Sequence, residues 1–283
     1  MATRPQMADP AGAVAAGKGG GSTPALEVRN AKKAFGAVQA VNNCSISLPQ
    51  GAIVGLVGPN GSGKSTFIEG ISGLQRFDSG EVHLHGRSIG HLAPHRRARL
   101  GLRRSFQVSR LWPRLSVAEN LLAAAPIRGR DALWRVYFSR GWIREVETET
   151  KEKAKQILQK YNLWDLRNER AGALSGGQSR LLEFARIMIS EGSVALLDEP
   201  LAGVNPVMSE NVAEGIRELQ ASGMTILLVE HDLGFVGEIC TVVHAMDRGA
   251  IILSGTMDDV ASSDFFARSY IGGPVGEEEP DGS

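Results

Sequence analysis

The chain has 283 residues, of which 42% are hydrophobic and 22% are charged, and its 31 basic residues balance 31 acidic ones. This length suits one large α/β domain or two smaller ones, and the zero net charge argues against a general affinity for nucleic acid. The two cysteines, Cys44 and Cys240, are too few for a disulfide scaffold and lack metal-site spacing, which favours a reducing compartment.

No apolar run reaches the roughly 18–20 residues that cross a bilayer. The N-terminal region has Arg4 but lacks the continuous apolar segment of a signal peptide. We therefore expect the protein in the cytosol unless a partner holds it at a membrane. Residues 1–24 are rich in Ala, Gly and Pro, and residues 274–283 are acidic. Both segments are predicted to be disordered tails, because they offer little apolar surface to bury.

After the first tail, the pattern is that of an α/β fold. Period-two alternation and short apolar runs predict strands around residues 26–28, 44–48, 52–58 and 82–84, with a helix over 66–71. The run AIVGLVG is continuous, as expected of a strand buried on both faces of a sheet.

The middle of the chain changes character over about residues 111–173. Ser116 and Glu119 form a capping box ahead of a helical run, and a charged helical pattern follows. A mostly helical insert therefore interrupts a core made of residues 25–110 and 174–273. In the second part of the core, two more buried-strand runs are followed by a predicted β-turn at Asp247–Ile252.

The sequence GPNGSGKST follows a buried strand and opens a helix, which is the context required of a phosphate-binding P-loop. Glycines let backbone N–H groups surround phosphates, the helix start adds positive charge, Lys64 reaches the β- and γ-phosphates, and Ser65 binds Mg²⁺. The alternative is a glycine-rich turn that matches by chance. The predicted phosphate-binding residues are Gly58, Asn60, Gly61, Gly63, Lys64, Ser65 and Thr66.

Acidic and histidine side chains stand where two later strands end. In an open α/β sheet, ligands bind beyond the carboxyl ends of the strands. Asp198 is therefore predicted to lie on the Mg²⁺ side, and Glu199 to act as general base toward water. His231 is predicted to contact the γ-phosphate or orient the water. The alternatives are a solvated carboxylate for Glu199 and a structural role for His231.

A second helix start comes later, where Ser175 can cap a helix whose first glycines, Gly176 and Gly177, leave their N–H groups accessible. If this anion site lies in the helical insert, it is too far from the P-loop of the same chain. Two chains packed head to tail as a C₂ dimer would let each helix start face the nucleotide of the other chain. The alternative is an ordinary capped helix that binds no ligand.

These motifs carry a resemblance. LSGGQ at Leu174–Gln178 resembles the signature motif of the ATP-binding-cassette (ABC) ATPases, and the resemblance covers about Leu26–Gly272. It implies an α/β fold with a P-loop NTPase core and mixed sheet, an antiparallel β subdomain and an inserted α-helical subdomain. It also implies ATP and Mg²⁺ as cofactors, and a dimer in which Ser175, Gly176, Gly177 and Gln178 close on the ATP of the partner subunit.

The resemblance adds roles for three further residues. Phe35 resembles the aromatic residue that stacks on adenine, with a core Phe as the alternative. Gln107 resembles the Q-loop glutamine that contacts Mg²⁺, together with Ser65 and with Asp198 acting through water. Asn205 lies in a segment that resembles the D-loop. Asp is commoner at this position, and Asn carries no charge, which puts a carboxylate role there in doubt.

Within the family, the chain is similar to ATPases of branched-chain amino acid importers and of urea or short-amide importers. The stretches that carry this similarity are ISGLQRFDSGEV, LAPHRRARLGLRRSFQ, RLWPRLSVAENL and AGVNP. The implied partners are a second ATPase subunit, two transmembrane permeases and, indirectly, an extracytoplasmic solute-binding protein, with no nucleic acid. The implied location is the cytoplasmic face of the membrane.

Three rival functions stay open. Lipopolysaccharide-export ATPases contain segments similar to PHRRAR and are the group most easily confused with these importers. Soluble ABC proteins of ribosomes or DNA usually carry two cassettes or a long coiled coil, which this chain lacks. An inactive nucleotide-binding subunit is disfavoured by the intact Lys64, Asp198, Glu199 and His231.

Five arginines cluster ahead of Gln107, at Arg96, Arg97, Arg99, Arg103 and Arg104. We expect a solvated face, with a membrane-surface or docking role as the alternative. Nucleic-acid binding is disfavoured, since no aromatic residues are interleaved with these arginines.

Overall fold

The computed structural model describes residues 23–105, 111–126 and 140–263, without the side chains of 140–147. Both predicted tails therefore lie largely outside the described residues, as does Gln107. None of the helices in the described part of the chain is long and apolar enough to cross a bilayer.

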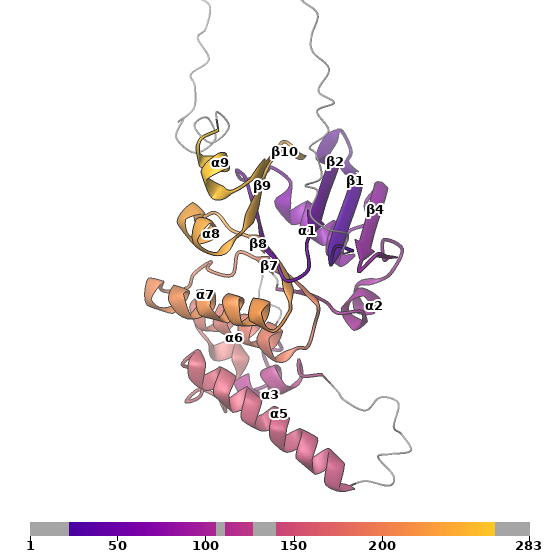
Figure 1. Cartoon of the computed structure of the whole chain (residues 1–283). Coiled ribbons are helices and arrows are strands. Elements are labelled where there is room, and N and C mark those ends of the chain that lie inside the picture. The colour runs from indigo at the N-terminus through magenta and orange to yellow at the C-terminus, as the bar shows by residue number, and fades with distance from the viewer. Residues whose placement is uncertain (1–22, 106–110, 127–139, 264–283) are drawn as a thin grey trace, which may run out of the picture.

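The strands form two sheets (Figure 1). The antiparallel sheet has the order β2-β1-β4-β5. Its strands are β1 (Leu26–Phe35), β2 (Val38–Leu48), β4 (Ser79–Leu84) and β5 (Arg87–Ser88). The mixed sheet has the order β10-β9-β3-β8-β7-β6 and is parallel except for the β9–β10 pair. Its strands are β3 (Ile53–Val57), β6 (Leu102–Arg104), β7 (Val194–Asp198), β8 (Thr225–Val229), β9 (Val242–Asp247) and β10 (Ala250–Gly255).

The helices cover the mixed sheet and extend beyond it. They are α1 (Lys64–Ser72), α2 (Pro94–Arg99), α3 (Val117–Leu122), α5 (Arg140–Lys160), α6 (Gly176–Ile189), α7 (Pro206–Ala221), α8 (Leu233–Ile239) and α9 (Met257–Ala261). A short 3₁₀ helix spans Ala171–Ala173. Helices α3 and α5 lie at the end of the molecule away from the antiparallel sheet (Figure 1). These elements confirm the predicted fold class.

The central strands are buried on both faces, as their continuous apolar runs predict. In β8, Ile226 and Leu228 pack into a core with α3, α5, α6 and α7. Leu227 and Val229 point to the other face and pack with α1 and the antiparallel sheet. The alternation of side chains along a strand thus sends neighbouring residues into two separate cores.

Local sequence signals set several element boundaries. Ser116 and Glu119 form the predicted capping box at the start of α3. Arg248 and Gly249, with φ of 44° and 82°, make the predicted turn between β9 and β10, since a two-residue I′ turn needs positive φ at both positions. Helix α1 starts at Lys64, two residues earlier than predicted.

Candidate nucleotide-binding and hydrolysis site

The strand order places the predicted site residues at one edge of the mixed sheet. Strands β3, β8 and β7 are neighbours and run parallel. The P-loop follows β3, Asp198 and Glu199 lie at the end of β7, and His231 follows β8. The sheet therefore gathers groups that are more than 170 residues apart in sequence, counted from Gly58 to His231.

Glycine is required where the P-loop approaches other backbone. Gly58 and Gly63 have φ of 154° and 106°. A Cβ atom on Gly58 would lie 2.1 Å from the carbonyl oxygen of Met246, and one on Gly63 would lie 2.1 Å from that of Ala40. No side chain fits at such distances, so the loop packs against β9 and β2 only because these residues are glycine.

The Lys64 side chain lies inside the loop. Its Nζ donates hydrogen bonds to the carbonyl oxygens of Gly58 at 2.7 Å and Pro59 at 3.0 Å. Burial lowers the pKa of Lys64, and the carboxylates of Glu199 and Asp198 act in the opposite direction. The loop thus presents a cation at the start of α1, where the helix dipole also favours anions.

Asp198 is almost fully buried, with 1% of its surface exposed. Its Oδ2 accepts a hydrogen bond from Nη2 of Arg104 at 3.1 Å, and its backbone N–H donates to Oγ of Ser105 at 2.8 Å. Burial raises the pKa of Asp198, and Arg104 opposes the shift. Oδ1 is buried and has no hydrogen-bond partner among the described residues. A free buried carboxylate oxygen fits a site for Mg²⁺, which prefers oxygen ligands and keeps several waters.

Glu199 and His231 are in contact. Nε2 of His231 lies 2.9 Å from Oε1 of Glu199, and the histidine side chain is half exposed while Glu199 is mostly buried. Glu199 has a positive φ of 50°, and its N–H donates to the carbonyl oxygen of Val229 at 2.9 Å. A non-glycine residue with positive φ is uncommon outside sites that need it. The solvated-carboxylate alternative does not fit this paired geometry.

Glu230 belongs to the same cluster, although it is not among the site residues predicted from the sequence. Its Oε1 accepts the N–H of Leu201 at 2.8 Å, and its Oε2 accepts the N–H of His231 at 3.1 Å. Burial raises the pKa of Glu230, while these two N–H groups oppose the shift. Glu230 therefore ties the turn after β7 to the backbone of His231. Its place in VEHD, beside the predicted histidine, was the available signal.

Phe35 ends β1, in the hairpin whose second strand contacts the P-loop through Ala40. Its side chain is 48% exposed, so the alternative of a core Phe is wrong. Nζ of Lys33 lies 5.3 Å from the ring centroid. The exposed ring is available to stack on a planar ligand.

The second predicted helix start is the N-terminus of α6. Oγ of Ser175 accepts the N–H of Gln178 at 3.3 Å, while Oε1 of Gln178 accepts the N–H of Ser175 at 2.9 Å. A Cβ atom on Gly176 would meet nothing within 4 Å, whereas one on Gly177 would lie 2.7 Å from the carbonyl oxygen of Gly203. One face of this helix start is open and the other packs against the predicted D-loop.

Asn205, in that D-loop, caps α7. Its Oδ1 accepts the N–H of Val207 at 2.8 Å, and Pro206 occupies the first helical position. Asn is among the preferred N-cap residues, so the side chain has a local structural role in this chain.

The arginine cluster differs from the solvated face we expected. Arg97 is 2% exposed and donates hydrogen bonds to four carbonyl oxygens, including those of Gly70 and Ile71 in the last turn of α1. Arg104 is bound to Asp198, and Arg103 donates to the carbonyl oxygens of Ala98 and Glu191. The expectation is therefore wrong for these three arginines, because the folded chain presents backbone and carboxylate acceptors to them.

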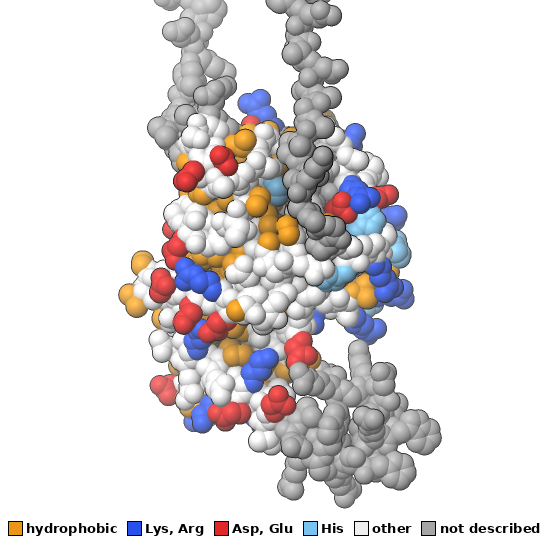
Figure 2. Space-filling view, viewed as in Figure 1, with side chains coloured by type: hydrophobic (Ala, Val, Ile, Leu, Met, Phe, Trp, Pro, Cys, Tyr) orange, Lys and Arg blue, Asp and Glu red, His pale blue; other side chains and the backbone are white. Residues whose placement is uncertain are grey.

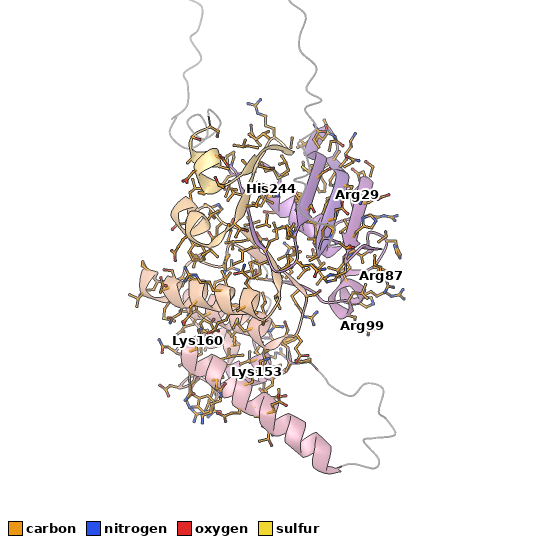
Figure 3. All side chains as sticks on the ribbon, in the orientation of Figure 1. Arg29, Arg87, Arg99, Lys153, Lys160 and His244 are labelled. Atoms are coloured by element: carbon orange, nitrogen blue, oxygen red, sulfur yellow. The ribbon has the colours of Figure 1, made fainter. Side chains whose placement is uncertain are left out.

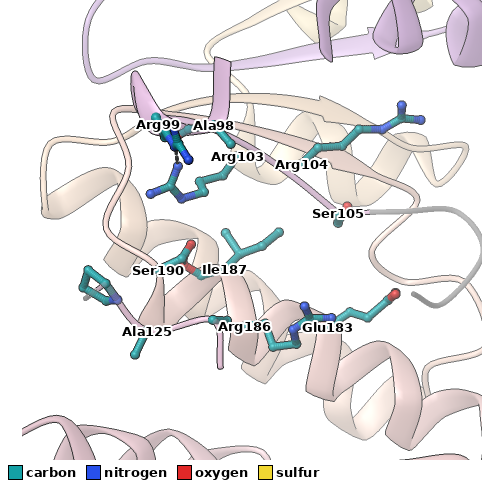
Figure 4. A pocket seen from close by; sticks show the side chains of 12 residues that line it. Ala98, Arg99, Arg103, Arg104, Ser105, Ala125, Glu183, Arg186, Ile187 and Ser190 are labelled. Carbon is teal, nitrogen blue, oxygen red and sulfur yellow. Dashed lines mark hydrogen bonds between the residues drawn. The ribbon is translucent and has the colours of Figure 1, made fainter. Parts of the chain in front are cut away.

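A cavity of about 370 Å³ separates this part of the core from α6. Arg99, Arg103 and Ser105 line one side and Arg186 and Ile187 of α6 the other (Figure 4). Ser105 is the last described residue before Gln107, so the cavity lies where the segment with the predicted Q-loop leaves the core.

The ABC transporter family model matches residues 41–202. The chain belongs to the ABC transporter family. LivG of Archaeoglobus fulgidus, a probable branched-chain amino acid transport ATP-binding protein, is 38% identical over 90% of this chain and 98% of its own. Escherichia coli LivG is 32% identical over 89% and 99%. A nucleotide-free ATP-binding cassette superposes with a TM-score of 0.73 at 33% identity, covering 88% of this chain and 100% of the other.

A second cassette of an ABC transporter, in its ADP conformation, gives a TM-score of 0.72 at 31% identity over 88% of this chain and 99% of the other. The family and its nucleotide-bound member make this chain a nucleotide-binding ATPase subunit of an ABC transporter. The predicted family and enzyme class are thereby confirmed.

Proposed function

We propose that the chain powers the import of branched-chain amino acids, or of related small polar solutes such as urea or amides. The support is that relatives from Archaeoglobus fulgidus, Escherichia coli and Pseudomonas aeruginosa, each matched over about 90% of this chain, are named branched-chain amino acid transport ATP-binding proteins. The alternative, lipopolysaccharide export, is supported only by short sequence segments that resemble those of export ATPases.

The observation that carries the hydrolytic part of the proposal is the contact between Glu199 and His231. Glu199 accepts a proton from the attacking water as general base. His231 holds the carboxylate in place and orients the water. The carboxylate of Glu230 accepts the backbone N–H of His231 and so holds that residue in position. Glu199, with its positive φ, has its side chain in contact with the histidine.

The P-loop residues from Gly58 to Thr66 bind the phosphates through backbone N–H groups and the Lys64 ammonium. The adenine stacks on Phe35. Ser65, Asp198 and, beyond the described residues, Gln107 hold Mg²⁺. When bound, this cation neutralises charge on the transferred phosphoryl group. Arg104 donates to Oδ2 of Asp198, so Oδ1 would be the oxygen left to hold the cation.

The active form is a dimer with a second ABC ATPase subunit, in which Ser175, Gly176, Gly177 and Gln178 contact the ATP of the partner subunit. The open face of Gly176 supports this assignment. Closure of the dimer draws the helical inserts of the two subunits, about 111–173, together and moves the docked membrane partner. Two permeases dock beside the cavity next to Ser105, which places the subunit on the cytoplasmic face of the membrane.

The test is purification of the tagged chain from native membranes in mild detergent, followed by mass spectrometry of the associated proteins. Recovery of two polytopic membrane proteins, a second cassette ATPase and an exported binding protein is expected for an importer. The ligand preference of the binding protein then identifies the solute. Recovery of lipid-export components alone would replace import by export.

A further inference from the structure

Helix α2 and its surroundings carry charge that the ATP chemistry does not use. From Val82 to Ala118 the sequence contains no Asp or Glu, and this stretch holds four of the six histidines. The exposed basic side chains on and next to α2 form one surface, here called the basic ridge: Arg76, Arg87, His91, His95, Arg96 and Arg99. Its four arginines give a formal charge of +4.

The ridge is continuous in space. Arg76 and His91 line a cavity of about 570 Å³ that also contains Arg97, and His95 lines a neighbouring one of about 290 Å³ that shares Arg97. Arg99 lines the cavity next to Ser105, which shares Ala98 with the second. Lys, Arg and His side chains gather along one edge of the molecule in Figure 2, and Figure 3 places Arg87 and Arg99 on that edge.

Arg97 fixes the ridge to the core. Two hydrogen bonds from its guanidinium, to the carbonyl oxygens of Gly70 and Ile71, hold α2 against the end of α1. Two more go to carbonyl oxygens in the segment just before α2. Its neighbours Arg96 and Arg99 therefore point to solvent on a rigid support, and binding through them costs less ordering than binding through a loop.

The ridge cations have no partners among the described residues, since no hydrogen bond or ion pair is formed by any of the six side chains. Elsewhere on the surface Arg29 pairs with Glu27 at 2.8 Å and Lys160 with Glu218 at 2.8 Å. Two acidic residues, Asp78 and Glu81, line the same cavity as Arg76 and His91, and each contacts a basic residue outside the ridge. Asp78 binds Lys33, and Glu81 lies 3.6 Å from His83.

We propose that the basic ridge binds the anionic lipid headgroups of the membrane beside the transporter. The proposal rests on the proposed function, because the ridge adjoins the cavity beside which the permeases are placed. Guanidinium groups bind phosphate oxygens with two parallel hydrogen bonds. A bilayer surface rich in anionic lipid attracts each such cation by about fivefold in affinity.

The composition of the ridge favours lipid over a protein partner. The centre of a protein interface combines arginines with aromatic residues and Met as anchors, and the ridge supplies arginines and histidines but none of the aromatic or Met anchors named there. Four exposed arginines on and next to α2, without acidic partners among the described residues, instead match a diffuse sheet of phosphates.

The test is flotation of the purified full chain with phosphatidylcholine vesicles that contain either no or 50% phosphatidylglycerol. Binding is expected only to the anionic vesicles and is expected to fall at 0.5 M NaCl. Arg96→Glu/Arg99→Glu is expected to weaken it by at least about 25-fold, because losing two cations removes two fivefold terms and the new carboxylates are repelled by the lipid phosphates. The matched control, Lys32→Glu/Lys153→Glu, makes the same charge change at two exposed lysines outside the ridge and is expected to bind nearly as the wild type does.

Three results would overturn the proposal. The wild type could ignore anionic vesicles, or both double variants could lose binding equally, which would reduce the effect to net charge. The ridge variant could also keep vesicle binding and lose only binding to detergent-purified permeases, which would assign the ridge to an acidic protein segment. ATP turnover in detergent-free solution is expected to be unchanged in both variants, so a failure here is distinct from a failure of the proposed ATP chemistry.

Discussion

At the scale of single residues, the candidate site contains two close side-chain contacts made by neighbouring carboxylates. Glu199 and His231 meet at 2.9 Å, and Asp198 and Arg104 meet at 3.1 Å. The two carboxylates are adjacent in sequence yet have opposite surroundings. Asp198 points into the core and is held by a permanent cation, whereas Glu199 is turned by its positive φ toward a half-exposed histidine. Adjacent carboxylates thus have environments suited to different tasks.

Glu199→Gln is expected to keep ATP affinity near the wild-type value and to lose nearly all turnover. The amide preserves the size of the side chain but cannot accept a proton from water. Because hydrolysis no longer reopens the closed form, the variant is expected to accumulate as a dimer with ATP. Equilibrium nucleotide binding, phosphate release and size-exclusion chromatography measure these three quantities. Wild-type phosphate release would remove Glu199 from the role of general base.

Arg104→Ala is expected to destabilise the fold by about 3–5 kcal/mol, the usual cost of leaving a buried charge without its partner. The side chains of Arg104 and Asp198 are 8% and 1% exposed, so water cannot replace the lost contact. Urea unfolding followed by tryptophan fluorescence measures the loss. In the background of Asp198→Asn the same substitution is expected to cost much less. Equal costs in both backgrounds would show that the pair itself contributes little.

At the scale of elements, two helix starts have the same local chemistry and different surroundings. Helix α1 begins in a loop closed by β2 and β9, with Lys64 inside it. Helix α6 begins with a capping box whose first glycine faces open space. A helix start that is open on one side is suited to a ligand brought by another subunit.

The pair Gly176→Ala and Gly177→Ala separates packing within the chain from contact across the dimer. Gly177→Ala brings a Cβ within 2.7 Å of the Gly203 carbonyl oxygen and is expected to lower stability by about 1–3 kcal/mol. Gly176→Ala meets no neighbour in this chain and is expected to leave stability and ATP affinity unchanged. Its turnover is nevertheless expected to fall about tenfold or more, a barrier increase of about 1.4 kcal/mol. Thermal melting and steady-state turnover test this, and full turnover in Gly176→Ala would place the nucleotide elsewhere.

At the scale of the whole molecule, the mixed sheet buries a titratable group in β9, the strand next to β3 and the P-loop. His244 of β9 is 8% exposed, and its Nδ1 lies 2.7 Å from Oγ of Ser254. Its Nε2 has no hydrogen-bond partner among the described residues. Burial lowers the pKa of His244 to about 4. Protonation of this histidine therefore opposes the folded state.

Stability is expected to fall between pH 6.5 and pH 4 in a way that depends on His244. The unfolded histidine, with a pKa of about 6.5, takes up a proton first as the pH falls, so the stability contribution is complete above that pH and is lost below it. The difference of about 2.5 pKa units corresponds to about 3 kcal/mol. Urea unfolding at pH 7.5, 6 and 5 is expected to show a flatter pH dependence for His244→Leu than for the wild type. Parallel curves would contradict this origin.

The sequence by itself determined the features that depend on neighbours along the chain. The P-loop, the capping box at Ser116, the helix cap at Ser175 and the turn at Arg248 and Gly249 each need a few adjacent residues, because caps and turns satisfy backbone groups within one turn of chain. The central strands were also predictable, since burial on both faces requires continuous apolar runs.

Only the tertiary structure decided which distant groups meet. The sheet order β3-β8-β7 brings His231 to Glu199 and Glu230 to the backbone of Leu201, and no local pattern encodes that order. The arginines ahead of Gln107 also differ in burial for a tertiary reason. Arg97 and Arg104 donate to backbone and carboxylate acceptors inside the core, whereas Arg96 and Arg99 are exposed to solvent. A charged side chain is buried only where the fold supplies its partners, and those partners come from other parts of the chain.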